Sequence, residues 1–312
     1  MVRQGFLRKA GIVKRLLIGA LLALLVFAAG CASTAPGAPA TSTEAPARPL
    51  VISAIPDQDP EKLQRLYGDV AAYLSSVLGI PVEYRPVTDY AASVTAFKVG
   101  DLDLVWYGGL TGVQARLQVP GAQAIAQRDI DEQFTSVFIA NKASGIRELA
   151  DLKGRTFTFG SESSTSGRLM PQYFLEQNGI LPSDFAGEPG FSGSHDKTIE
   201  LVAAGAYDAG ALNSQVWKSR LAEGKIDTSV VDVFWTTPSY YDYHWVIHPN
   251  VAVRYGDDMV TRIQQALLAL DPNVPEQQAI LELFGARRFI ATRNENYAAI
   301  EQVAREIGLI VE

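Results

Sequence analysis

The sequence predicts an α/β fold of two lobes, in each of which helices flank a mostly parallel sheet. The 312 residues are 47% hydrophobic and 20% charged, a length and composition that suit two lobes of ordinary size. Short apolar strands alternate with amphipathic helices in the first half of the chain, and the alternation returns in the second half. Two extended segments, residues 134–140 and 231–238, separate the halves, and we expect these crossover strands to act as a hinge.

The N-terminal segment is typical of a secretory signal. Five basic residues and no acidic residue precede an apolar run over residues 16–29, which is shorter than the ~20 residues of a membrane span. The run ends near Cys31, the only cysteine of the chain, and looks like a bacterial lipoprotein signal. We expect a signal peptide over residues 1–30, then a flexible linker over residues 31–49 that begins at a lipidated Cys31. A plain signal peptide with an incidental cysteine is the alternative, and either reading places the protein outside the cytoplasm, in the periplasm or at the cell surface.

The first lobe is expected to begin with alternating strands and helices. Asp59 and Pro60 are typical of a helix start, and Gly79 follows the last of a series of apolar residues at helical spacing. Strand, helix, strand in this order favours a parallel sheet with helices on both faces. The expected elements are strands over residues 51–55, 81–87 and 102–107, with helices over residues 60–78 and 89–100 between them.

The second lobe repeats this pattern. We expect strands over residues 156–160 and 208–212 and helices over residues 166–178 and 196–204. Residues 93–104 and 198–209 also share a Gly-x-x-Asp motif between a helix and a strand, ending in Asp103 and Asp208. The shared motif favours two lobes of related topology, although any turn from a helix to a strand can carry these residues.

The two crossovers make the first lobe discontinuous in sequence. We expect it to contain residues 50–135 plus 239–312, and the second lobe to contain residues 136–238. Apolar spacing predicts that the end of the chain, residues 257–309, is mostly helical.

A run of hydroxyl side chains is the strongest candidate for a binding site. Ser164, Thr165 and Ser166 follow a predicted strand and begin a predicted helix. A helix start offers unpaired N–H groups and a partial positive charge, so hydroxyls beside it suit an anion. The alternative is a simple helix cap with spare serines.

Three weaker candidates accompany it. His195 enters the next helix and can donate to an anion, or it belongs to a capping turn. Tyr107 ends a strand, where such folds place ligands, or it is an aromatic plug. Packing at the hinge accounts for most of the aromatic run over residues 240–245, but we expect Tyr241 to reach the cleft.

Several classes of function are disfavoured. The net charge of −7 supplies no basic field for nucleic acid, and a single cysteine excludes an internal disulfide framework and a Cys-based zinc site. The hydrolase, Walker and zinc-protease motifs are absent from the sequence, and Ser194-x-x-Lys197 lacks its companion motifs. His244 and His248 would not converge on a metal from a strand. We therefore expect no enzyme activity, no cofactor and no metal.

The order of these motifs resembles the phosphonate-type substrate-binding proteins of ABC importers, which include phosphite- and selenate-binding members. The resemblance rests on the lipoprotein signal, residues 149–156 before the hydroxyl strand, Ser-Thr-Ser-Gly at a helix start, Ser-Gly-Ser-His before the next helix, and Gly-x-x-Asp before a strand. It implies a periplasmic-binding-protein fold of the second type, with the ligand between the lobes.

The resemblance also implies roles and partners. The implied ligand is a small tetrahedral oxyanion, and the implied partners are the permease subunits of an importer, with the protein itself a monomer. A sensor that presents the anion to a membrane kinase, or an enzyme of the same fold, is the alternative. Carried over by position, the ligand-binding residues are Tyr107, Ser164, Thr165, Ser166, His195 and Asp208. Asp208 would accept a proton from a singly protonated anion or contact an ammonium group of the ligand, or it would only anchor nearby N–H groups.

Overall fold

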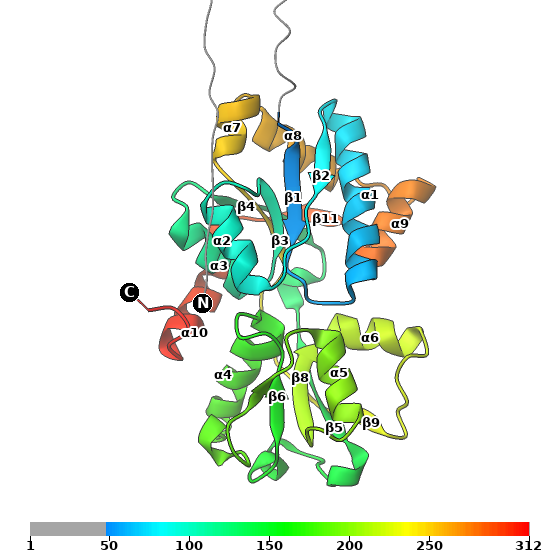
Figure 1. Ribbon diagram of the computed structural model, residues 1–312, viewed down its shortest axis with the longest axis vertical. Coiled ribbons are helices and arrows are strands. Elements are labelled where there is room, and N and C mark those ends of the chain that lie inside the picture. The colour runs from blue at the N-terminus through cyan, green and yellow to red at the C-terminus, as the bar shows by residue number, and fades with distance from the viewer. Residues whose placement is uncertain (1–47, 312) are drawn as a thin grey trace, which may run out of the picture. The chain divides into compact units, whose positions relative to one another are not determined.

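A computed structural model of the chain describes residues 48–311 (Figure 1). The predicted signal peptide, the lipidated Cys31 and most of the predicted linker lie outside the described residues. Within the described part of the chain, no helix combines the length and the hydrophobicity that crossing a bilayer requires.

Two sheets organise the described residues, and each forms the centre of one lobe (Figure 1). The first sheet contains, in spatial order, β11 (Phe289–Ala291), β4 (Gln123–Arg128), β10 (His244–Ile247), β3 (Leu104–Tyr107), β1 (Leu50–Ala54) and β2 (Val82–Tyr84). The second contains β7 (Gly190–Phe191), β6 (Phe157–Phe159), β8 (Ala209–Asn213), β5 (Ser136–Asn141) and β9 (Val231–Thr236). The exact boundaries of the two predicted lobes stay a prediction.

The expectation of mostly parallel sheets was wrong, because both sheets are mixed. β1 is parallel to β2 and β3, and β6 is parallel to β7 and β8, whereas β10 and β5 are antiparallel to both of their neighbours. β5 and β10 are the first strands that the chain forms after it crosses between lobes. Each therefore starts where the parallel strands end, as the pairs Ser136–Asn213 and His244–Tyr107 show.

Helix α1 (Pro60–Leu78) has the termini that the sequence predicts. The Asp59 side chain accepts a hydrogen bond from the Lys62 N–H, and Gly79 ends the helix in a left-handed conformation with φ 71°. The apolar face of the helix is buried against the first sheet and contacts the helices α8 (Met259–Leu268) and α9 (Pro275–Phe284). This face comprises Leu63, Leu66, Tyr67, Val70, Ala71, Leu74 and Leu78.

The remaining helices divide into expected and unexpected ones. The sequence predicts α2 (Tyr90–Lys98), α4 (Met170–Gln177), α5 (His195–Ala203) and α10 (Ala298–Glu306). It does not predict α3 (Gly109–Gln118), α6 (Ser214–Ala222) and α7 (Asn250–Tyr255), nor the strands β4 and β11. α3 lacks a clear apolar stripe because its first five residues are all buried, including two glycines.

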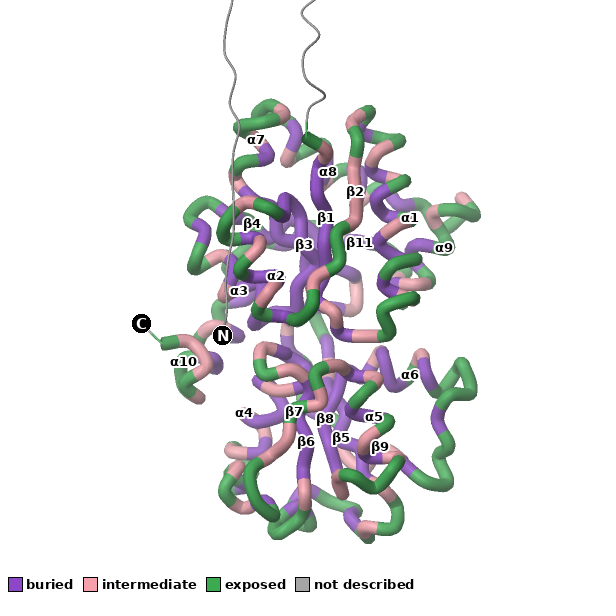
Figure 2. Tube along the Cα trace, viewed as in Figure 1, coloured by how far each residue is buried: buried purple, intermediate pink, exposed green. Residues whose placement is uncertain are grey.

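Most residues of the central strands of both sheets are buried, as the purple parts of the tube in Figure 2 show. All five residues of β1 and all four of β3 are buried in the first lobe. In the second lobe the two faces of the sheet carry separate apolar clusters, one including Phe138 and Phe157 and the other Ile139 and Trp217. Alternation along β5 places Phe138 and Ile139 on opposite faces.

The shared Gly-x-x-Asp motif has one structural role in both lobes. The Asp103 carboxylate accepts a hydrogen bond from the Val51 N–H at 2.9 Å, and the Asp208 carboxylate accepts one from the Thr156 N–H at 2.9 Å. Each aspartate therefore ties together the starting ends of two neighbouring parallel strands. This edge of the second sheet is opposite to the one that faces the first lobe.

The two lobes are joined where the crossover segments meet. Phe134 and Tyr240 form an isolated antiparallel bridge, with N–H to carbonyl distances of 2.9 Å in both directions. The carboxyl ends of β1 and β3 in the first lobe and of β6 and β8 in the second lie near this crossing (Figure 1). Ligands of open α/β sheets bind at such carboxyl ends.

Candidate anion-binding site

The predicted hydroxyl cluster lies between the lobes and is closed from solvent. Ser164, Thr165 and Ser166 are at most 2% exposed. Ser164 caps a π-helical turn, Thr165–Leu169, that leads into α4, and its Oγ accepts a hydrogen bond from the Gly167 N–H at 2.9 Å. Thr165 Oγ1 accepts from the Leu110 N–H at 2.8 Å, a bond that joins the second lobe to the first turn of α3.

Glycines permit the close packing of this turn. The Gly160 N–H donates to the Gly167 carbonyl at 2.7 Å. A Cβ added to Gly167 would lie 2.9 Å from Ser164 Oγ, 3.1 Å from the Gly160 Cα and 3.2 Å from His195 Cε1. Because Gly160 and Gly167 have no side chains, Ser164, His195 and the end of β6 can pack closely around Gly167.

Asp242 faces the hydroxyl cluster from the first lobe. One of its carboxylate oxygens accepts from the Gly109 N–H at 2.9 Å, and the other is buried with no hydrogen-bond partner among residues 48–311. A Cβ placed on Gly108 would lie 3.0 Å from Thr165 Oγ1 and 3.2 Å from the Asp242 Oδ1. Burial raises the pKa of Asp242 to about 7, against the opposing bond from Gly109.

The backbone of Asp242 is fixed on both sides. Its N–H donates to the Asp131 carbonyl at 3.1 Å, and its own carbonyl lies 3.1 Å from His244 Nδ1. A carbonyl only accepts, so the Nδ1 atom of His244 carries the proton. The His244 ring stacks on Tyr297 with a centroid distance of 3.7 Å, and burial lowers its pKa well below the ordinary value, which keeps the ring neutral.

His195 completes the polar surface on the second lobe. Its side chain is fully buried, and burial lowers its pKa to about 4, so the ring is neutral near neutral pH. The Asn213 N–H points to Nδ1 at 3.4 Å, and Nε2 therefore carries the proton and donates to the Tyr243 hydroxyl at 3.3 Å. The His195 backbone N–H donates to the Asp57 carbonyl at 2.9 Å, which is another contact between the lobes.

Tyr90 contributes a second buried group without a partner. Its hydroxyl makes no hydrogen bond among the described residues, although the side chain is 2% exposed. Burial raises its pKa well above the ordinary value, the charge of Asp57 adds to this effect, and the Ser164 hydroxyl opposes it. The Tyr90 hydroxyl is therefore a neutral donor near neutral pH. Buried polar groups are normally paired, so Tyr90 and Asp242 point to a polar ligand.

Four of the residues that the sequence predicts are brought together here, and three are not. The Tyr107 hydroxyl donates to the Ser93 carbonyl at 2.8 Å inside the first lobe, because Tyr107 points to the face of the sheet that α2 covers. The Tyr241 hydroxyl lies 3.5 Å from a Glu132 carboxylate oxygen near the surface. Asp208 is at the far end of β8, where Thr156 holds it.

Sequence reasoning missed Asp242, Tyr90 and the amides that begin α3. One signal was available, since a single carboxylate stands within the aromatic run over residues 240–245. A charged residue in such a run is buried at a cost unless it has a function or a partner. Among the described residues, no group of three or more His, Cys, Asp or Glu side chains is placed to hold a metal ion.

Comparisons with known proteins agree with this geometry. Residues 52–297 match the family model for the periplasmic substrate-binding proteins of phosphonate ABC transporters. The chain belongs to this family. The predicted resemblance is therefore confirmed, and the protein is a periplasmic substrate-binding protein of the ABC-transporter class.

Two relatives and one solved structure illustrate the similarity. The chain is 47% identical to a probable ABC transporter phosphite-binding protein, PhnD1, from Prochlorococcus marinus strain MIT 9301, over 84% of this chain and 90% of the relative. It is 28% identical to the phosphonates-binding periplasmic protein of Escherichia coli K12, over 73% and 67% of the two chains. The structure of PhnD1 with methylphosphonate superposes with a TM-score of 0.82 and covers 84% of this chain and 98% of that one. These matches confirm the predicted two-lobed binding-protein fold.

Proposed function

We propose that this protein binds a small, singly protonated tetrahedral oxyanion of the phosphite or methylphosphonate type and presents it to the permease subunits of an importer. The observation that carries the proposal is a pair of buried atoms beside the hydroxyl cluster, Asp242 Oδ2 and Tyr90 Oη, that have no hydrogen-bond partner among residues 48–311. The names of the relatives, a phosphite-binding protein and a protein solved with methylphosphonate, support the same ligand class.

Neutral donors suit such an anion. The Ser164 and Thr165 hydroxyls lie at the start of the π-helical turn, and the first two amides of α3 hold Asp242 and Thr165 beside them. In a site without water, fixed dipoles stabilise an anion without the strong desolvation that a lysine would suffer. Specificity then depends on how many oxygens the ligand has and which of them carry protons.

Asp242 selects for a proton on the ligand. A fully ionised dianion would bring its oxygen against the free Asp242 oxygen, where two negative charges would repel each other. With one proton shared between the carboxyl and the ligand, the same contact becomes a hydrogen bond. The sequence assigned this role to Asp208; we assign it to Asp242 instead, because Asp208 holds Thr156 at the other end of the sheet.

Calorimetric titration with phosphite, methylphosphonate and sulfate tests the proposal. Phosphite and methylphosphonate should bind, with affinity that falls as the pH rises from about 6 to about 8, because the shared proton is lost. Sulfate, which carries no proton at these pH values, should bind far more weakly at pH 8, where the ionised Asp242 carboxyl would repel it. Tighter binding of sulfate than of phosphite would overturn the proposal.

Two substitutions test whether Asp242 causes the pH dependence and the discrimination against sulfate. Asp242→Asn should flatten the pH dependence and reduce the discrimination against sulfate, since the amide cannot repel an anion. Asp208→Asn is the matched control, because Asp208 holds Thr156 at the other end of the sheet and should leave affinity unchanged.

We also propose that the protein acts as a monomer and that a lipid on Cys31 holds it at the membrane. The support is the sequence alone, in the basic and apolar signal before Cys31. Cys31→Ser should block processing or release the protein from the membrane fraction. Membrane fractionation of a processed Cys31→Ser protein would contradict the anchor.

A further inference from the structure

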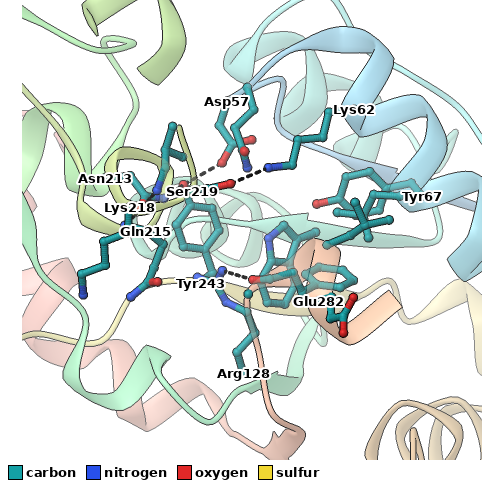
Figure 3. A pocket seen from close by; sticks show the side chains of 17 residues that line it. Asp57, Lys62, Tyr67, Arg128, Asn213, Gln215, Lys218, Ser219, Tyr243 and Glu282 are labelled. Atoms are coloured by element: carbon teal, nitrogen blue, oxygen red, sulfur yellow. Dashed lines mark hydrogen bonds between the residues drawn. The ribbon is translucent and has the colours of Figure 1, made fainter. Parts of the chain in front are cut away.

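A cavity of about 300 Å³ lies between the lobes beside the anion site (Figure 3). The first lobe contributes residues that follow β1 and begin α1, together with part of α9, and the second lobe contributes the end of β8 and the start of α6. Asp57, Asn213 and Tyr243 line the cavity, while His195 and the hydroxyl cluster are not among its lining residues. These three side chains are therefore a wall between the cavity and the anion site.

The wall is held together by its own hydrogen bonds. The Tyr243 hydroxyl donates to Asp57 Oδ2 at 2.7 Å and accepts from Asn213 Nδ2 at 3.1 Å, as the labelled side chains in Figure 3 show. It also accepts from His195 Nε2 at 3.3 Å, which connects the wall to the anion site. Each of the three wall side chains is at most 3% exposed.

The cavity provides space on the far side of the wall. Beside Ser164 and His195 the backbones of Gly160 and Gly167 pack closely, and a Cβ on Gly167 would lie 3.1 Å from the Gly160 Cα. On the side of Asp242, the packing of His244 against Tyr297 fills the interior. A substituent that is longer than the anion's own oxygens and points toward Tyr243 therefore meets the wall, whose side chains have a cavity beyond them.

We propose that Asp57, Asn213 and Tyr243 limit the ligand to substituents no larger than a methyl group, and that alkylphosphonates with longer chains are excluded because they would have to break this wall. The inference rests on the proposed function, since it assumes that the phosphonate oxygens occupy the hydroxyl cluster. Displacing Tyr243 would also leave the buried Asp57 carboxyl without its donor and would disrupt the stack of Tyr243 on Trp106, whose centroids are 5.7 Å apart.

Titration with methyl-, ethyl- and propylphosphonate tests the wall. The wild-type protein should bind methylphosphonate and discriminate against propylphosphonate by at least about tenfold. Tyr243→Ala should open the wall and reduce this ratio by about tenfold or more, because the propyl chain can then enter the cavity. Tyr243→Phe keeps the ring and should keep the ratio of the wild type, although its affinity for every ligand can fall.

A second wall variant and a control variant complete the test. If Tyr243→Ala does not fold, Asp57→Ala shortens the wall with less loss of packing, and the same fall in the ratio is expected. Glu282→Gln, on the α9 side of the cavity and exposed, should leave the ratio unchanged. An unchanged ratio in a folded Tyr243→Ala or Asp57→Ala protein that still binds methylphosphonate would overturn the wall alone. Absence of both methylphosphonate and phosphite binding in the wild type would overturn the proposed function, and this inference with it.

Discussion

Thr165 connects ligand binding to contact between the lobes. Its hydroxyl accepts from the Leu110 N–H at the start of α3, and it lies beside the Asp242 carboxyl that we propose as the partner of the ligand. The same atom thus belongs to the site and to the closed arrangement of the lobes. Neither function depends on a formal charge on Thr165.

Replacing Thr165 with Ala should weaken anion binding by about 1–3 kcal/mol, the range for a hydrogen bond to a charged group. The variant also loses the bond to Leu110, so part of the effect reflects closure. Calorimetry on Thr165→Ala and Thr165→Ser separates the hydroxyl from the methyl group, because the serine variant should stay near the wild type. Equal loss in both variants would show that packing of the methyl group, rather than the hydroxyl, matters.

The buried carboxyls should make the ligand-free protein sensitive to pH. Burial raises the pKa of Asp242 to about 7 and that of Asp57 to about 6, from an ordinary value of 3.8. The folded protein therefore binds these protons more tightly than the unfolded chain. The stability that this supplies is complete below the ordinary value and is lost as the pH rises through about 6 and then about 7.

Chemical unfolding at several pH values measures this effect. Buried His195 and His244 act in the opposite direction over the same window, because their lowered pKa values make the folded protein bind fewer protons than the unfolded chain. The test is therefore the difference between two proteins: from about pH 4 to about pH 7, the free energy of unfolding of the wild type should fall relative to that of Asp242→Asn, in which one raised carboxyl no longer titrates. A difference that stays constant through this window would contradict the raised pKa of Asp242.

At the scale of elements, the site depends on how closely α3 approaches β10. A Cβ added to Gly112 would lie 2.3 Å from His244 Nε2, a distance that no real contact reaches. His244 in turn donates to the backbone carbonyl of Asp242. Gly112 therefore lets α3 pack closely against β10. This close packing leaves room for His244, which holds the backbone of Asp242, the proposed partner of the ligand.

Gly112→Ala should push His244 from its position, lower the melting temperature and weaken anion binding together. Gly68→Ala is the matched control, because Gly68 is also inside a helix but its added Cβ would meet nothing within 4 Å. That control should be neutral or stabilise the fold by up to about 1 kcal/mol, as Ala favours helices over Gly. Thermal unfolding and calorimetry of the two variants decide between a local clash and a general effect of helix composition.

Sequence reasoning predicts parts of the site that are local and misses parts that are assembled from distant segments. The hydroxyl cluster was found because a strand, a turn and a helix start are adjacent in sequence. Asp242 was missed because Asp131, Gly109 and Thr165, which surround it, are far away in the chain. Asp208 was misplaced for a reason that strand direction explains: a residue that precedes a parallel strand lies at the edge opposite to its carboxyl end.

For the fold as for the site, features set by neighbouring residues were predicted, and features set by contacts between distant segments were not. The termini of α1 follow from Asp59, Pro60 and Gly79, and the structure confirms them. The mixed sheets were not predicted, because the directions of β5 and β10 depend on where the chain crosses between lobes. The face on which Tyr107 lies also depends on the register of β3 in the assembled sheet, which the sequence does not show.

At the scale of the whole molecule, an ion-pair network holds the lobes together away from the ligand. Asp196 in the second lobe accepts from Arg220 at 2.6 and 2.7 Å and also accepts from the Asp59 N–H of the first lobe at 2.8 Å. Lys62 of α1 donates to Ser219 of α6 at 3.1 Å. None of these side chains hydrogen-bonds to the hydroxyl cluster or to Asp242, so we expect the network to act on binding through closure.

Asp196→Ala should therefore weaken the binding of phosphite and methylphosphonate by the same factor, on the order of tenfold, without changing their ratio. Lys197→Ala on the same helix is the control, since the exposed Lys197–Glu200 pair should contribute nothing measurable. A change in the ratio of the two affinities would place Asp196 in the recognition of the ligand instead.

The crossing of the two segments between the lobes also bears on how long a ligand stays bound. The Tyr240 hydroxyl donates to Ser136 Oγ at 2.6 Å, and the Ser136 hydroxyl donates to the carbonyl of Ser166 at 2.8 Å, so both segments are tied to the hydroxyl cluster. An anion enclosed by this arrangement leaves only after the lobes separate about the Phe134–Tyr240 bridge. The opening rate of this crossing is therefore an upper limit on the dissociation rate of every ligand, and anions with different equilibrium affinities share that limit.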